Sequence, residues 1–183
     1  MGKFLEQPTC GLVHLDISKN LITDIGLIQM CHSLKLNTSL KYLNLSSNKI
    51  KDESLSDLVD FLNINTKMEE LALGGNIISN EGIMHLSRFL PNNSTLSHLE
   101  ISKNNFTDSG FEVFAKALAF NKGLKFLDIS RNKDLSDEAS LVTLAEALIR
   151  NSSLKTLDLT ALKIRKPFMK LHLEPALRKN MCL

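Results

Sequence analysis

The amino-acid sequence predicts an α/β solenoid of about six repeats, each contributing one parallel strand and one helix. Similar nine-residue stretches recur at steps of 28 residues, with 30 residues before the last. A period of 20 to 50 residues is typical of stacked structural repeats. Within each unit, a stretch with alternating apolar residues precedes a segment with helical apolar spacing. The stretches begin at Leu12, Leu40, Met68, Leu96, Leu124 and Leu154.

The first half of each repeat predicts a short strand. In Leu43-Asn44-Leu45, alternate side chains face opposite sides of the strand, so the leucines point into a core and Asn44 points outward. An asparagine follows most of the strands, where its amide can hydrogen-bond the backbone of a tight turn. These asparagines are Asn20, Asn48, Asn76, Asn104 and Asn132.

The second half of each repeat predicts a helix, as the spacing of Leu55, Leu58 and Leu62 illustrates. Hydroxyl side chains at the expected helix starts predict N-caps, and an aspartate in the first turn suits the helix dipole. The N-cap candidates are Thr23, Ser79, Thr107 and Ser136, and the first-turn acids are Asp24, Asp52, Asp108 and Asp137. A second asparagine closes each helix, at Asn37, Asn65, Asn93, Asn121 and Asn151.

The pattern L-x-x-L-x-L-x-x-N over residues 12–164 resembles the leucine-rich repeat. The resemblance implies a horseshoe with a parallel sheet on the concave face and helices on the convex face. Units of 28 to 29 residues with a full helix resemble the ribonuclease-inhibitor-like class, which includes Ran GTPase-activating protein, tropomodulin and the repeat regions of NOD-like receptors. That class is typically intracellular.

We expect a single domain over residues 1–183, with an irregular last repeat at 154–183. Leu162 stands where the sixth turn asparagine is expected, and Pro167 and Pro175 interrupt the last helix. Terminal repeats need polar caps, which neither end plainly supplies. We therefore expect the natural protein to extend past one or both ends.

Charge and composition exclude several classes of partner. The formal net charge of +2 argues against a nucleic-acid surface built on bulk basicity. The absence of a long apolar run or of a signal-peptide pattern predicts an intracellular, cytoplasmic chain without a membrane span. Cys10, Cys31 and Cys182 lack metal or redox spacing, so we expect reduced thiols. We also expect a monomer.

No pattern in the sequence indicates an enzyme. Phosphate-binding glycine motifs are absent. His14 and His98 occupy equivalent outward positions, but three strand spacings place them about 14 Å apart, too far to share a metal ion. Cys31 beside His32 lacks an identifiable orienting acid, and Cys31 is better interpreted as a buried residue of a helix. We therefore predict no catalytic residue, cofactor or metal site.

The outward strand positions form columns along the concave face, and we expect these columns to be free of structural roles. The first column contains the exposed aromatics Tyr42 and Phe126, which are typical interface anchors. The second is rich in acids, which favours a partner with a basic surface over an ordinary solvated face. The third is small and hydroxylic. The candidate partner-binding residues are His14, Asp16, Tyr42, Asn44, Glu70, His98, Glu100, Phe126, Asp128 and Asp158.

The favoured function is therefore a non-enzymatic scaffold that binds a protein on its concave face. The resemblance also allows a regulator of a small GTPase, or a cytoskeletal or innate-immune regulatory domain, although the generic repeat matches no catalytic motif. A basic cluster in the last repeat is interpreted as solvated surface charge, and a site for an anionic membrane or partner is the alternative. It comprises Lys163, Arg165, Lys166 and Lys170.

Overall fold

The computed structural model describes residues 11–180, and its six strands form one parallel sheet in chain order. Equivalent residues of neighbouring repeats are paired, so that His14 lies opposite Tyr42, and Tyr42 opposite Glu70. The strands are β1 (His14–Asp16), β2 (Tyr42–Asn44), β3 (Glu70–Ala72), β4 (His98–Glu100), β5 (Phe126–Asp128) and β6 (Thr156–Asp158). The predicted strand positions and their register are confirmed.

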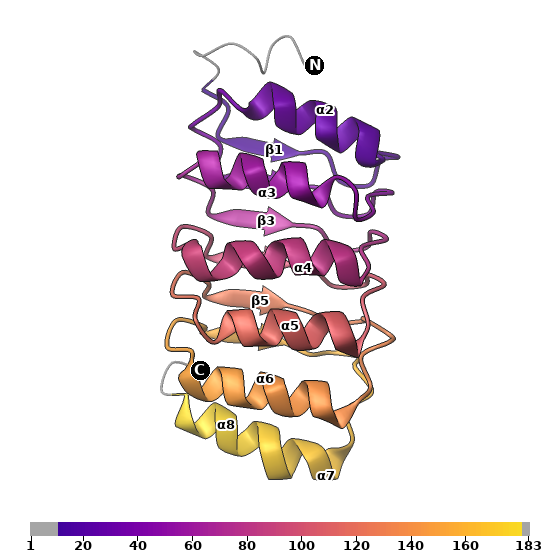
Figure 1. Ribbon diagram of the computed structural model, residues 1–183, viewed down its shortest axis with the longest axis vertical. Coiled ribbons are helices and arrows are strands. Elements are labelled where there is room, and N and C mark those ends of the chain that lie inside the picture. The colour runs from indigo at the N-terminus through magenta and orange to yellow at the C-terminus, as the bar shows by residue number, and fades with distance from the viewer. Residues whose placement is uncertain (1–10, 181–183) are drawn as a thin grey trace.

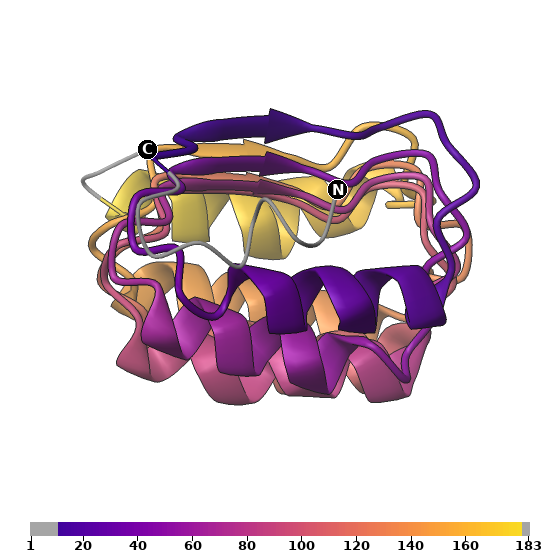
Figure 2. The same ribbon diagram turned by 90° about the horizontal axis from the view of Figure 1, so that it is seen from above.

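Helices cover one face of this sheet and leave the other open (Figure 1). Seen along the stack, the sheet and the helices form two separate layers (Figure 2). The helices of the first five repeats are α2 (Asp24–Leu34), α3 (Leu55–Ile64), α4 (Asn80–Phe89, continued by the 3₁₀ turn Leu90–Asn92), α5 (Asp108–Leu118) and α6 (Glu138–Arg150). The last repeat carries α7 (Lys166–Phe168), a π-helical turn (Met169–Leu173) and α8 (Glu174–Lys179).

The core lies between these two layers. The inward leucines of β2 to β5 are almost fully buried, as at Leu43 and Leu99, and they pack with helix residues such as Phe61 and Phe114. Burial of apolar surface at about 25 cal/mol per Å² is the main force that holds such layers together. The chain therefore folds as the predicted α/β solenoid of six repeats.

The turn asparagines join each repeat to the one before it. Asn76 illustrates the pattern: its Nδ2 donates to Leu45 O (3.0 Å) and Leu73 O (2.9 Å), and its Oδ1 accepts from the Ile50 N–H (3.1 Å). Asn48 and Asn104 make equivalent bonds to their preceding repeats. The predicted turn role is confirmed, and it extends between repeats because buried backbone groups need partners.

The helix starts differ from the prediction. Thr23, Ser79 and Thr107 do occupy N-cap positions, but their side chains accept no hydrogen bond from the helix. Ser136 is not the N-cap of α6, because Asp137 takes that position and accepts from the Ala139 N–H at 3.1 Å. Asp52 precedes α3 and does not lie in its first turn.

Side chains from the preceding repeat cap these helices. Asp52 Oδ1 accepts the N–H groups of Ser79 (2.7 Å) and Gly82 (3.0 Å) at the start of α4. Asp24 accepts from the Ser54 N–H and hydroxyl at the start of α3 in the same way. Asn80 accepts from the Thr107 N–H at the start of α5 (2.8 Å). The side-chain oxygens of these three residues therefore accept hydrogen bonds from N–H groups at the helix starts of the following repeat, which have no partner within their own helix.

The last described repeat differs from the others. Leu162 occupies the asparagine position and packs against the core. Pro167 and Pro175 are the second residues of α7 and α8, and the π-helical turn joins these segments continuously, so the prolines do not interrupt the helix as expected. Asn180 nevertheless continues the helix-closing asparagines by donating to Leu148 O and Asn151 O. No helix between residues 11 and 180 has the length and apolar character needed to cross a membrane. Cys10 and Cys182 lie outside the described residues.

Candidate partner-binding face

The sheet face turned away from the helices, the concave face, carries the first predicted column as two stacked ring pairs. The His14 and Tyr42 rings lie 3.9 Å apart between centroids, and those of His98 and Phe126 lie 5.6 Å apart. The in-register pairing of β1 with β2, and of β4 with β5, places each pair side by side. Stacking leaves Tyr42 and Phe126 half-buried, so part of each ring still contacts solvent.

The second column has a structural role that the sequence analysis did not expect. Asp16, Asn44, Asp128 and Asp158 each accept the backbone N–H two residues further along, at 2.7 to 3.0 Å. Such hydrogen bonds fold the turn that follows each strand. The expectation that these positions are free of structural roles is therefore wrong for these four residues.

The turn bonds also affect ionisation. Hydrogen bonds from Ser18 hold the pKa of the Asp16 carboxyl below its ordinary value, and those from the hydroxyl and backbone of Thr160 do the same for Asp158. Asp16 additionally accepts from Asn44 Nδ2 at 3.0 Å. Both carboxylates therefore stay ionised while they hold their turns.

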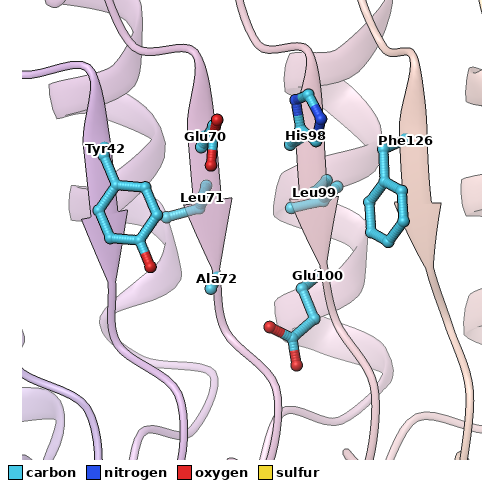
Figure 3. Close-up of a pocket in the computed structure, with 8 residues that line it drawn as sticks. All are labelled: Tyr42, Glu70, Leu71, Ala72, His98, Leu99, Glu100 and Phe126. Atoms are coloured by element: carbon cyan, nitrogen blue, oxygen red, sulfur yellow. The ribbon is translucent and has the colours of Figure 1, made fainter.

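Glu100 departs from this pattern. Its longer side chain makes no bond to the N–H two residues on, and instead accepts the Ser102 hydroxyl at 3.0 Å. The carboxylate lies over the end of β3, where Ala72 and Gly74 offer almost no side chain, and a methyl group added at Gly74 would overlap Glu100 Oε1. Figure 3 shows the Glu100 side chain pointing toward this bare strand.

A shallow hollow of about 160 Å³ lies on the concave face at the third and fourth repeats (Figure 3). Its side chains come from four successive strands, which places one aromatic ring on each side of two carboxylates. They are Tyr42, Glu70, Ala72, His98, Glu100 and Phe126. Within residues 11–180, neither Glu70 nor Glu100 forms an ion pair.

A second, more polar hollow of about 420 Å³ adjoins it at the ends of the strands. Glu100 borders both hollows, and Asp128 and Asp158 border only the second. Arg131 and Lys103 stand beside these acids, and both adopt positive φ angles (59° and 50°). The acidic column is therefore flanked by a basic edge at the strand ends.

The predicted site residues thus fall into three groups. The structure brings Tyr42, Glu70, His98, Glu100 and Phe126 together around the first hollow. His14 joins them only through its stack on Tyr42. Asp16, Asn44, Asp128 and Asp158 lie outside that hollow and hold turns. Gly74 belongs to the third column, whose small residues the sequence offers as positions of close approach for a partner, but the use of its space by the long Glu100 side chain was not predicted.

The residues weighed for chemistry do not form a reactive site. Cys31 is completely buried, and burial raises the pKa of its thiol to about 12. Asp57 Oδ1 lies 3.4 Å from His32 Nε2, so Asp57 is an acid beside His32 that the sequence analysis did not identify. Its negative charge, however, further raises the pKa of the Cys31 thiol and disfavours the thiolate. Among residues 11–180, no group of three or more His, Cys, Asp or Glu side chains is placed to hold a metal ion.

Comparisons with known proteins agree with this architecture. Four stretches of the chain, residues 12–31, 36–59, 65–87 and 92–115, match the family model described as "Leucine Rich repeat". No curated protein sequence matches the chain.

Two solved structures are similar to it in fold. Leiomodin-1 actin-binding site 2 superposes with a TM-score of 0.72 at 20% identity, over 82% of this chain and 87% of that one. The tropomodulin C-terminal domain of Caenorhabditis elegans gives a TM-score of 0.60 at 10% identity, over 98% and 90% respectively. At these identities the likeness concerns the fold alone. The repeat period, the in-register parallel sheet and the family match together identify the chain as a leucine-rich-repeat protein.

Proposed function

We propose that the chain is a non-enzymatic, intracellular scaffold that binds a protein partner through its concave face. The observation that carries the proposal is the hollow between Tyr42 and Phe126, with Glu70 and Glu100 inside it. Half-buried aromatic side chains are typical interface anchors, and the two carboxylates lack a cationic partner among the described residues. Bare positions at Ala72 and Gly74 let a partner approach the sheet closely.

The test is a cross-linking pull-down from cell lysate. The native chain is compared with a triple variant, Tyr42→Ala, Glu100→Lys and Phe126→Ala, whose folding is checked by circular dichroism. A matched triple, Glu112→Lys, Val113→Ala and Phe120→Ala, alters side chains on the helical side that are half-buried or exposed. We expect proteins that are lost from the first variant and retained by the second. Identical captures by both variants would place the interaction elsewhere on the chain.

A cytoskeletal role is the second candidate, because the fold resembles that of leiomodin-1 actin-binding site 2. The direct measurement is co-sedimentation with filamentous actin, together with binding to labelled actin monomers. Loss of actin binding in the Tyr42, Glu100, Phe126 triple variant would mean that actin is the partner that binds the concave face. A native chain that binds neither form of actin would retire this candidate and leave the scaffold proposal standing.

Regulation of a small GTPase and an innate-immune role stay alternatives, which no described feature or comparison favours. Acceleration of GTP hydrolysis across a small-GTPase panel is the measurement for the first. Charge reversal at Asp128 is a less suitable probe of the concave face than charge reversal at Glu100. It would also remove the hydrogen bond to the Ser130 N–H and disturb the turn.

A further inference from the structure

We propose that the hollow over β3 and β4 binds an arginine side chain of the partner, with its guanidinium between Glu70 and Glu100. This inference rests on the proposed function, because it names the chemical group that the concave face takes. It depends on three features: two carboxylates without an ion-pair partner among the described residues, aromatic rings on either side, and small residues, Ala72 and Gly74, beside Glu100.

The two carboxylates are available to a cation from outside the described residues. Four ion pairs form within residues 11–180, and none includes Glu70 or Glu100. Glu69, the sequence neighbour of Glu70, is by contrast paired with Lys41 at 2.7 Å. Two half-buried like charges on adjacent strands disfavour each other, and a bound cation relieves that repulsion.

The position of Glu100 is specific to this pair of repeats. At the equivalent position, Asp16, Asp128 and Asp158 turn back onto their own backbone, whereas Glu100 extends across the strand end of the preceding repeat. Gly74 makes this possible, because any side chain there would occupy the volume of the carboxylate. A carboxylate that is not used for a turn keeps acceptor capacity for a ligand.

The pair of carboxylates favours guanidinium over ammonium, and the rings bound the hollow on either side. Tyr42 on β2 and Phe126 on β5 flank the acids of β3 and β4, and three strand spacings separate these rings by about 14 Å. This gap is wide enough for one extended side chain. Arginine presents a planar fork of donors that can pair with both carboxylates, its aliphatic stem can pack beside a ring, and it is more weakly hydrated than lysine.

The test uses a short probe, so that it does not depend on identifying the partner. The capped peptide acetyl-Gly-Arg-Gly-amide is titrated into the ¹⁵N-labelled full chain and followed by two-dimensional NMR. Peptides with citrulline or lysine in place of arginine are the matched ligands, because citrulline keeps the shape without the charge and lysine keeps the charge without the fork. We expect saturable shifts at Ala72, Gly74 and Glu100 with arginine, weaker ones with lysine, and none with citrulline.

Two variants locate the site. Glu100→Gln removes the charge while preserving an acceptor for Ser102, and we expect it to weaken arginine binding about fivefold. Asp158→Asn is the control, because Asn44 shows that asparagine holds the same turn, and we expect binding within about twofold of native. Equal weakening by both variants, or equal binding of the lysine or citrulline peptide, would overturn the proposal.

The outcome can be separated from that of the proposed function. Arginine peptide binding without any effect of the concave-face variant in the pull-down would show that the hollow takes a guanidinium, and would reject the proposed partner-binding role of this face. Loss of protein partners in that variant, without peptide binding, would support the scaffold and reject the arginine site.

Discussion

At the scale of single residues, side chains one position apart on the same strand have opposite roles. Leu71 is 1% exposed and packs in the core, whereas its neighbour Glu70 lines the concave hollow. We expect Leu71→Ala to lower the free energy of unfolding by about 2 to 5 kcal/mol, through lost burial and a cavity. Glu70→Ala should change it by less than about 0.5 kcal/mol. Urea denaturation of both variants checks this, and comparable losses would contradict the strand register.

Cys31 offers a residue-scale test of the core between α2 and its neighbours. With the pKa of the thiol raised to about 12, roughly one molecule in ten thousand carries the thiolate at pH 8. We expect iodoacetamide to leave Cys31 unmodified in the native chain and to alkylate it in urea, as mapped by peptide mass spectrometry. Rapid native alkylation would show that this part of the helical layer opens easily.

The same thiol predicts a pH dependence. Because the folded state holds the Cys31 proton more tightly than the unfolded state, whose thiol titrates near its ordinary value of 9.0, the contribution of Cys31 to stability is constant below about pH 8. It should fall as the pH rises through 9 toward 12. A Cys31→Ala variant, compared with the native chain in urea denaturation at pH 7 and pH 10, isolates this contribution. An equal change of stability with pH in both proteins would contradict it.

At the scale of elements, each helix start depends on the repeat before it. Asp52 accepts two N–H groups of α4 although it lies before α3 in the chain. We expect Asp52→Ala to lower the free energy of unfolding by about 1 kcal/mol, the usual effect of a lost N-cap. Glu53→Ala is the matched control, since the exposed Glu53 side chain caps no helix. If Asp52→Ala leaves the free energy of unfolding unchanged, water replaces the carboxylate as the acceptor of these N–H groups.

Sequence reasoning reached the strands almost residue by residue, because a strict period repeats every inward leucine in the same local environment. Leu43 and Leu99, for example, could be placed in the core from their spacing alone. The caps could not be predicted, because a local rule assigns Thr107 to its own helix, whereas the structure satisfies the Thr107 N–H with Asn80 of the preceding repeat. Contacts between repeats follow from stacking geometry, which the pattern does not encode.

The candidate site was predictable in outline only. The outward columns followed from strand alternation, and all the charged and aromatic side chains of the hollow were among the predicted residues. Their unequal roles were not predictable. Asp128 and Glu100 look equivalent in the alignment, yet one extra methylene lets Glu100 reach over Gly74 while Asp128 closes on the Ser130 N–H.

At the scale of the whole molecule, stability depends on contacts between neighbouring repeats. Asn76→Ala should therefore affect the preceding repeat, because the Ile50 N–H loses its acceptor. We expect the Ile50 amide to exchange with deuterium about tenfold faster, while Ile78, whose N–H donates to Asn104, changes little. Asn20→Ala is the control, since the Asn20 amide donates only within its own turn. Equal acceleration at Ile50 and Ile78 would indicate general destabilisation.

The two sets of polar bonds between repeats point in opposite directions along the stack. Turn asparagines such as Asn76 hold the unit before them, and acceptors such as Asp52 hold the helix after them. A substitution in one unit is therefore felt in a unit about 28 residues away, toward one end or the other depending on which residue changes. Faster amide exchange would therefore appear in a repeat next to the one that carries the substitution. The direction of that offset along the chain would show whether a turn asparagine or a helix-capping acceptor had been lost.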